Sequence, residues 1–320
     1  MKAYTLKQLH QLPELTDLEI PMVNDSLAWV QLTASALNHR DIWITKGLYP
    51  NIRLGAVMGA DGCGIMNGQE YIINPGLAWG RNESCQSPEF RVLGVPDDGT
   101  FADFISIDHK YLYPKPDHLT SAQAAALPLA GVTAFRAIIK RAQLKKGEKV
   151  LISGIGGGVA LMAMQYAIAL ECEVYVTSGS DLKIAEAISL GAKAGYIYHD
   201  PDWPKKLLSD AGGVDVIIDG ACGAGFNQLV KVCLPGARIS FYGGTAGKIE
   251  GLNPQLIFWR QISILGTTMG SDADFSEMID FVDKYKIVPV IDSILPFEAI
   301  PEGFKKLMSG EQFGKIVFQH

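Results

Sequence analysis

Short apolar or alternating segments run through the amino-terminal part of the chain. They include "AWVQLTA" at 28–34, "EYIIN" at 70–74 and "TFADFISI" at 100–107, with glycine, proline, asparagine and aspartate between them. Alternation of apolar and polar residues with a period of two predicts strands that bury one face. Residues 1–118 are therefore expected to form a bent, mostly antiparallel β domain.

The pattern changes at about residue 119, where helical segments begin to alternate with short apolar strands. The predicted strands read "KVLISG", "EVYVTS", "AGYIY", "DVIIDGA", "ARISFYG" and "ISILGTT". Such alternation is typical of βαβ units around a parallel sheet. We therefore expect an α/β domain over residues 119–287. The strand-like end of the chain, residues 288–320, is expected to return to the first domain.

A glycine-rich loop follows the first of these strands. Gly154, Gly156 and Gly158 would let the backbone turn tightly and approach a pyrophosphate, and Gly157 and Val159 complete the candidate loop. The amides at the start of the apolar helix that follows would stabilise the phosphate charge. Because the strand, loop, helix and next strand all follow in order, the stretch predicts a dinucleotide-binding site.

The end of the second strand, "VYVTSGSDLK", bears on the choice of cofactor. NAD sites usually place Asp or Glu there to bind the ribose 2′-hydroxyl, whereas this chain has Ser178, with Lys183 nearby. A hydroxyl and a cation suit a 2′-phosphate, so NADP(H) is favoured over NAD(H), with His199 as a second contact. The alternatives are a solvated Lys183 on the next helix and an ordinary loop histidine.

Composition narrows the class of protein. With 320 residues, a formal charge of −6 and no sustained Lys/Arg run, the chain is long enough for two domains and unsuited to a nucleic-acid partner. No apolar run approaches the length of a membrane span, and no secretory signal is visible at the amino terminus. The cysteines show no pairing pattern, so free thiols and a cytoplasmic location are expected. They are Cys63, Cys85, Cys172, Cys222 and Cys233.

Several segments together resemble one family. In chain order they are "ALNHRDIWITKGLYP", "VMGADGCG", "AAALPLAGVTAFRAI", "SGIGGGVA", "SLGAKAGY", "FWRQISILGTTMGS" and "EQFGKIVF". The sequence resembles the medium-chain dehydrogenases/reductases, near the quinone oxidoreductase branch of the zinc-type alcohol dehydrogenases. The resemblance implies a GroES-like catalytic domain, a Rossmann domain, and hydride transfer in a cleft between them.

The resemblance also places the zinc ligands of the relatives, and this chain lacks them. Asn38, Ala60 and Leu129 stand at the three catalytic ligand positions. A catalytic zinc needs three protein ligands, so none is expected. The lobe that holds a structural zinc in relatives keeps only Cys85, with Asn82 three residues before it. One thiolate cannot complete a tetrahedral site, so this lobe is expected to be metal-free.

Other residues are assigned to the site by the same resemblance. Asn38 and Asp41 would lie beside the nicotinamide, Thr133 would approach the same pocket, and Tyr49 would act as a donor or a ring platform. Gly243, after the strand "ARISFYG", is assigned to the cofactor site. Each of the polar residues has a structural alternative, because Asn and Asp favour turns and Tyr packs in half-buried cores.

These features predict a zinc-independent enzyme. Without a Lewis acid to activate an alcohol, an activated acceptor such as a quinone or an α,β-unsaturated carbonyl is the expected small-molecule substrate. One alternative is a non-catalytic NADPH-binding redox sensor or structural protein, and a zinc alcohol dehydrogenase ranks last. The stretch "RQISILGTTMGS" is expected to form an unprotected edge strand and therefore to mediate a homodimer.

Overall fold

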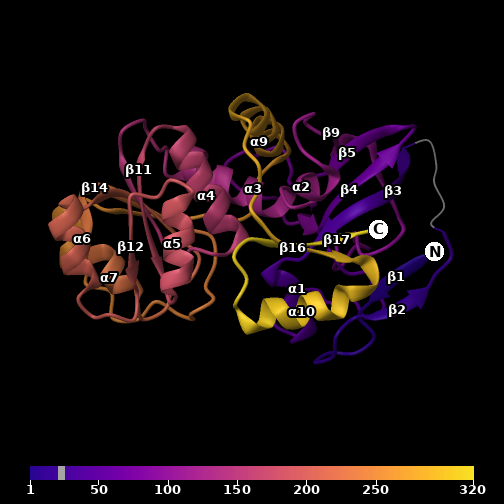
Figure 1. Ribbon diagram of the computed structural model, residues 1–320, viewed down its shortest axis with the longest axis horizontal. Coiled ribbons are helices and arrows are strands. Elements are labelled where there is room, and N and C mark those ends of the chain that lie inside the picture. Colours follow the sequence, from indigo (N-terminus) through magenta and orange to yellow (C-terminus); the bar gives the residue numbers. More distant parts are fainter. Residues whose placement is uncertain (21–25) are drawn as a thin grey trace. The chain divides into compact units, whose positions relative to one another are not determined.

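The computed structural model describes residues 1–20 and 26–320, and the chain divides into two units (Figure 1). The first unit contains Met1–Val132 and Gly270–His320, and the second contains Thr133–Met269. Both chain termini therefore belong to the first unit.

In its described residues, the first unit is built on a seven-stranded sheet. Its strands follow the order β16-β17-β3-β4-β5-β9, and β8 also pairs with β3. Ala28, Val30 and Leu32 alternate on the buried face of β3, as a period of two predicts. The strands of this unit are β1 (Lys2–Thr5), β2 (Glu14–Asp17), β3 (Leu27–Ala36), β4 (Asp61–Met66), β5 (Gln69–Ile73), β6 (Gly76–Leu77), β7 (Arg91–Val92), β8 (Phe104–Asp108), β9 (Leu112–Pro114), β16 (Ile291–Pro296) and β17 (Lys315–Gln319).

Helices close the first unit. They are α1 (His39–Thr45), α2 (Ser121–Ala125), α9 (Asp272–Tyr285) and α10 (Ile300–Ser309), and α3 (Pro128–Phe135) crosses into the second unit. In the core, Phe101 meets Phe304 and Phe318 edge to face, with ring centroids 6.3 and 5.5 Å apart.

The carboxyl-terminal strand returns to the first unit, as the sequence predicts. β17 pairs with β3 in antiparallel register, with Val317 opposite Ala36. Continuing this register by two residues on each segment brings Lys315 to the level of Asn38. The two residues are distant in sequence, and this pairing makes them neighbours.

The second unit is a doubly wound Rossmann domain. Its six strands are all parallel and follow the order β12-β11-β10-β13-β14-β15. The order reverses between β10 and β13, which is where such sheets bind ligands at the carboxyl ends of the strands. The strands are β10 (Lys149–Ile152), β11 (Glu173–Ser178), β12 (Ala194–Ile197), β13 (Val214–Asp219), β14 (Cys233–Phe241) and β15 (Ser263–Gly266).

Helices cover both faces of this parallel sheet. Figure 1 shows α4 and α5 on one side, and α6 and α7 on the other. Trp203, Phe226 and Ile217 share one buried cluster on the second side. The helices are α4 (Gly158–Ala169), α5 (Asp181–Ser189), α6 (Trp203–Ala211), α7 (Phe226–Lys231) and α8 (Pro254–Arg260), preceded by a π-helical turn over Arg136–Arg141.

The boundaries of the two units differ from those expected, residues 118/119 and 287/288. Residues 119–132 belong to the first unit, because α2 packs on β3 and β4. Residues 270–287 belong there too: the Phe275 ring on α9 lies 4.8 Å from that of Tyr113, and Asn74 donates to Asp272. Helical periodicity alone does not say which sheet a helix covers.

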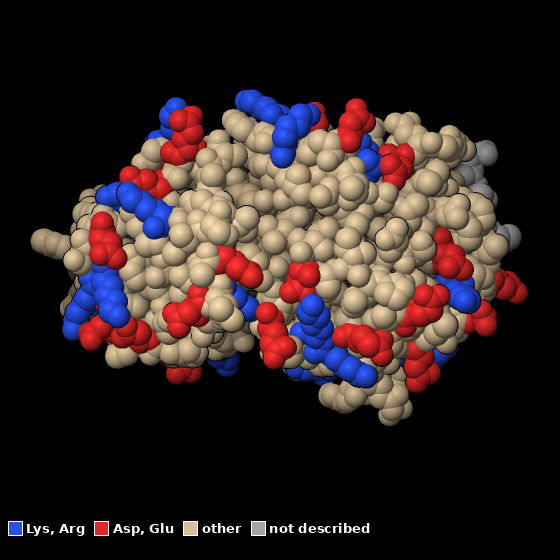
Figure 2. Space-filling view, in the orientation of Figure 1, with Lys and Arg blue, Asp and Glu red and all other residues tan. Residues whose placement is uncertain are grey.

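No helix in the described part of the chain is long and apolar enough to cross a membrane. On the face shown in Figure 2, lysine and arginine side chains are interspersed with aspartate and glutamate side chains.

Candidate active site

The glycine loop joins β10 to α4 and is tied to the neighbouring strand β11. The amide of Ile155 donates to the carbonyl oxygen of Thr177 at 2.8 Å, and the amide of Gly154 donates to the Thr177 hydroxyl at 3.3 Å. Gly154 and Gly156 have φ of 64° and 122°, which side chains rarely tolerate. The sequence prediction of a tight turn here agrees with this geometry.

Gly157 differs from its neighbours because no protein feature requires glycine at this position. It caps α4 with φ −80° and ψ 152°, which any residue adopts. Apart from its chain neighbours and the backbone of its own helix, a Cβ at Gly157 would meet no described atom within 4 Å. Gly158 and Val159 follow as the first residues of the twelve-residue helix α4. The amino end of α4 therefore opens onto free space, as a cradle for an anion requires.

The Lys183 side chain reaches the glycine loop from α5. A Cβ built on Gly156 would lie 2.9 Å from Cδ of Lys183 and 3.4 Å from its Nζ. Ser178, at the end of β11, is buried, and its Oγ accepts from the Ser180 amide at 3.2 Å. The cation predicted from the sequence therefore lies beside the predicted phosphate loop.

His199 also lies near the end of β11. Its ring stacks edge to face on Tyr198 at 4.3 Å. A Cβ built on Gly179, one residue beyond β11, would lie 2.7 Å from the Tyr198 hydroxyl and 3.5 Å from Nε2 of His199. The sequence reasoning passed over Tyr198, although it stands beside His199 in the chain.

Gly243 has a structural requirement of its own. A Cβ there would lie 2.7 Å from the carbonyl oxygen of Gly220, which follows β13. The carbonyl oxygen of Gly243 accepts from Sγ of Cys222 at 3.1 Å. Glycine at 243 therefore allows the carboxyl ends of β13 and β14 to approach closely.

In the first unit, Asn38 belongs to a buried polar network that includes a lysine. Nζ of Lys315 donates to Oδ1 of Asn38 at 2.6 Å and to Oδ2 of Asp61 at 2.8 Å. Nδ2 of Asn38 donates to the same Asp61 oxygen at 2.9 Å. Lys315 is 4% exposed and Asp61 is fully buried. An ammonium, a carboxylate and an amide thus meet where β17, β4 and the start of α1 come together.

Two further hydrogen bonds hold Asp61 in place. Its second carboxylate oxygen accepts from the Leu129 amide at 2.8 Å, and its carbonyl oxygen accepts from the Thr100 hydroxyl at 2.7 Å. Because the buried charge is paired and hydrogen-bonded, the network meets the conditions under which a buried ion pair is tolerated.

Asp41 lies in the first turn of α1 and holds the backbone of Asn38. Its Oδ2 accepts from the Asn38 amide at 2.9 Å, and its Oδ1 lies 3.6 Å from Arg40. Burial raises the pKa of Asp41 from its usual 3.8 to about 6, although Arg40 and the Asn38 hydrogen bond oppose this shift. Asp41 therefore positions Asn38 through its backbone amide.

Tyr49 packs against Arg40. The Arg40 guanidinium lies 4.7 Å from the Tyr49 ring centroid, and its Nε donates to the hydroxyl at 3.3 Å. The same guanidinium donates to the carbonyl oxygens of Leu93 and Val95 at 2.7 and 3.2 Å. Thr133, assigned to the same pocket by resemblance, belongs to the second unit, where its hydroxyl lies 3.9 Å from Sδ of Met269.

The residues at the zinc-ligand positions do not fit a zinc ion. Asn38 is engaged with Lys315, as is the neighbouring Asp61, and the side chains of Ala60 and Leu129 offer no ligand atom. A lysine ammonium would repel a divalent cation placed beside it. Among the described residues, no three His, Cys, Asp or Glu side chains gather as a metal site. Cys85 is exposed and accepts a hydrogen bond from Asn82 at 3.3 Å.

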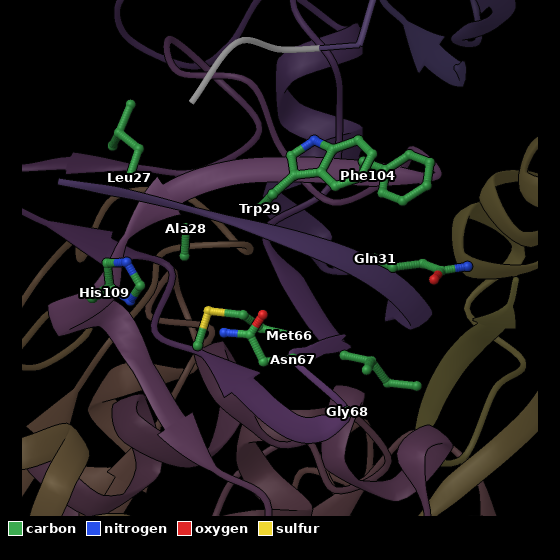
Figure 3. Close-up of a pocket in the computed structure, with 10 residues that line it drawn as sticks. Leu27, Ala28, Trp29, Gln31, Met66, Asn67, Gly68, Phe104 and His109 are labelled. Atoms are coloured by element: carbon green, nitrogen blue, oxygen red, sulfur yellow. The ribbon is translucent and has the colours of Figure 1, made fainter. Parts of the chain in front are cut away.

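A separate hollow of about 480 Å³ lies on the first unit. Figure 3 shows the rings of Trp29 and Phe104 beside each other at its rim, and they stack at 4.2 Å. His109 and Asn67 also line it. None of the predicted site residues lines this hollow, so it is distinct from the candidate site.

Comparison with known proteins decides the family. A model of zinc-binding dehydrogenases matches residues 158–284. The zinc-type alcohol dehydrogenase-like protein YogA of Leptosphaeria maculans is 33% identical, over 91% of this chain and 89% of its own length. The chain belongs to the medium-chain dehydrogenase/reductase family. It is therefore an oxidoreductase with a GroES-like catalytic domain and a Rossmann domain, as the sequence predicts.

Solved structures of this family include different activities. A crystal structure of an NAD-dependent alcohol dehydrogenase matches with a TM-score of 0.94 at 34% identity, covering 100% of both chains. The quinone oxidoreductase of Thermus thermophilus, also solved with NADPH, matches with a TM-score of 0.85 at 25% identity, again over 100% of both chains. Family membership alone therefore leaves cofactor and acceptor to be argued from this chain's residues.

Lys315 is a further residue that the sequence motifs do not predict. It stands in "GKIVF", which predicts a strand, and a lysine inside an apolar strand is a signal of a buried partner. Arg40 was missed for a different reason, because its acceptors are backbone oxygens that no sequence pattern reveals.

Proposed function

We propose that this chain is a zinc-independent, NADP(H)-dependent reductase of quinones or α,β-unsaturated carbonyls, acting in the cytoplasm. The observation that carries the proposal is the Lys315–Asn38–Asp61 network, in which Asn38 stands at a position that the resemblance assigns to a zinc ligand. A network that already contains a cation leaves no set of ligands for zinc, and alcohol oxidation in this family relies on that ion. An acceptor that is already electrophilic does not need it.

NADP(H) is the cofactor that the second unit favours. Gly157 leaves space at the amino end of α4 for the pyrophosphate, and Lys183 lies beside that loop. β11 ends in Ser178 rather than in an acidic residue that would repel a 2′-phosphate. The NADPH complex of the quinone oxidoreductase relative supports this preference, and the NAD-dependent relative supports the alternative.

The bound nicotinamide would supply the hydride, which reaches an electrophilic carbon of the acceptor. Negative charge then builds up on the acceptor's oxygen, and a hydrogen bond from Asn38 stabilises it before solvent supplies the proton. Asp41 accepts a hydrogen bond from the Asn38 backbone amide and so holds that residue in place. Tyr49 packs against the guanidinium of Arg40, the residue before Asp41.

NADPH consumption on a panel of quinones and enones tests this function. We expect turnover with at least one acceptor class. Tight NADPH binding with no turnover on any acceptor would instead favour the non-catalytic redox sensor or structural protein.

A further inference from the structure

We propose that Lys315 is a positioning residue that, together with Asp61, fixes the Asn38 amide as the hydrogen-bond donor to the substrate's carbonyl oxygen. The inference rests on the proposed function and assigns a role to a residue that family membership does not. It follows from the chemistry of the three groups and from their burial.

The orientation of the Asn38 amide is set by its neighbours. An ammonium can only donate, so the Asn38 atom 2.6 Å from Lys315 must be the oxygen. A carboxylate only accepts, so the atom 2.9 Å from Asp61 must be the nitrogen. An amide next to ordinary hydroxyls could flip, whereas this one has a single orientation.

One donor of the network is left over. The Asn38 nitrogen carries two N–H groups, and within the described residues only Asp61 accepts from it. The second N–H therefore has no partner among these residues. Because Lys315 withdraws electron density from the amide oxygen, this N–H is a stronger donor than that of an isolated asparagine.

Stability alone gives little reason to bury these charges. Lys315 is 4% exposed and Asp61 is fully buried. An apolar pair of similar volume is often as stabilising as a buried ion pair, since both charges must leave water. A fixed donor with a defined direction is a gain that an apolar pair cannot provide.

A double-mutant cycle tests whether Lys315 acts through Asn38. We expect Lys315→Met and Asn38→Ala each to lower kcat with a quinone by about tenfold or more, while KM for NADPH stays unchanged. If Lys315 acts through Asn38, Lys315→Met has no further effect in the Asn38→Ala background. Independent, multiplicative losses would overturn the proposal.

Two variants separate positioning from folding. Lys315→Arg keeps a cationic donor and should retain more activity than Lys315→Met at equal thermal stability. Lys306→Met removes the ion pair between the partly exposed Lys306 and Asp292 in the same unit, and it should leave kcat unchanged. If Lys315→Met fails to fold, Asp61→Asn takes its place in the cycle, with the same expectations. Equal activity of the Arg and Met variants would contradict the proposal.

A second readout does not depend on turnover. In the full-length protein with NADP⁺ bound and asparagine labelled with ¹⁵N, cyclohexanone serves as an unreactive carbonyl probe. We expect the probe to shift the side-chain N–H signals of Asn38 in the wild type but not in Lys315→Met. An unmoved Asn38 signal, or the same shift in both proteins, would overturn the inference. If no acceptor is reduced, the proposed function fails, and this experiment still decides the role of Lys315.

Discussion

The side chain of Lys183 lies against Gly156, with its Nζ 3.4 Å from the place where a Cβ of that glycine would stand. The cation therefore borders the loop that would hold the pyrophosphate. Lys183 also follows the end of β11, where folds of this type hold the ribose 2′ position, and we propose that it contacts the 2′-phosphate that NADPH has and NADH lacks.

Removing the Lys183 cation should weaken NADPH binding and leave NADH binding almost unchanged. A charge-assisted contact contributes roughly 1–3 kcal/mol, so Lys183→Ala should raise the Kd for NADPH several-fold or more. Fluorescence titration with both cofactors measures this. Lys205→Ala, which removes an exposed lysine paired with Asp202, is the matched control. An unchanged ratio of the two Kd values in Lys183→Ala would contradict the assignment.

A methyl group at position 157 should harm cofactor binding and spare the fold. Gly157→Ala meets no protein atom and has an allowed φ, so the thermal midpoint should be unchanged or slightly higher. The same methyl group would occupy the pyrophosphate cradle and should raise the Kd for NADPH about tenfold or more.

Gly243→Ala is the contrasting variant, because its Cβ would lie 2.7 Å from the Gly220 oxygen. It should lower the thermal midpoint. Full NADPH affinity in Gly157→Ala would show that the pyrophosphate does not lie at this helix end.

The buried Asp41 carboxyl should make stability depend on pH. Its pKa is raised to about 6 in the folded protein, mainly by burial, from a usual value of 3.8. A raised acid pKa contributes stability that is present below 3.8 and is lost as the pH rises through about 6. The shift corresponds to about 3 kcal/mol.

Asp41→Asn removes this titration while keeping an oxygen for the Asn38 amide. The free energy of unfolding of the variant minus that of the wild type should therefore be larger at about pH 7 than at about pH 4, as unfolding measured at both values would show. For Asp280→Asn, at an exposed position of α9, the free energy of unfolding should depend on pH as it does in the wild type. If the stability of Asp41→Asn also depended on pH as the wild type does, Asp41 would not titrate in this range.

We propose a homodimer formed through β15. This strand stands last in the order of the parallel sheet and pairs with β14, so no other strand among the described residues covers its outer edge. Arg141 donates there to the carbonyl oxygen of Gly266 at 3.0 Å. Phe258 and Trp259 on the preceding helix are 65% and 79% exposed. Light scattering should give about twice the single-chain mass of 34.7 kDa.

Ile264→Pro should convert this dimer to a monomer by removing a backbone donor from the edge, while Cys85→Ser should have no effect. Circular dichroism checks that the proline variant stays folded. A single-chain mass for the wild type would contradict the dimer.

Much of the fold follows from periodicity and from the glycine loop. The sequence predicts the parallel strands "KVLISG" to "ISILGTT" in their order along the chain, because apolar runs bounded by turns carry a local signal. The assignment of α2 and α9 to the first unit was not predictable in this way, since it depends on which sheet each helix covers.

The same limit applies to the candidate site. Sequence reasoning pointed to Asn38 and to the empty zinc positions but missed Lys315. That residue reaches Asn38 only because β17 pairs with β3, a contact between the two ends of the chain. Local patterns carry no information on such a register.

Turnover by the metal-stripped protein shows whether reduction proceeds without zinc. The protein is treated with a chelator, its zinc content is measured by elemental analysis, and NADPH oxidation is followed with a quinone. A primary alcohol with NADP⁺ is assayed in parallel. We expect less than stoichiometric zinc, quinone reduction at the rate of the untreated protein, and no alcohol oxidation. One tightly held zinc ion per chain, or quinone reduction that is lost on stripping and restored by zinc, would contradict this expectation.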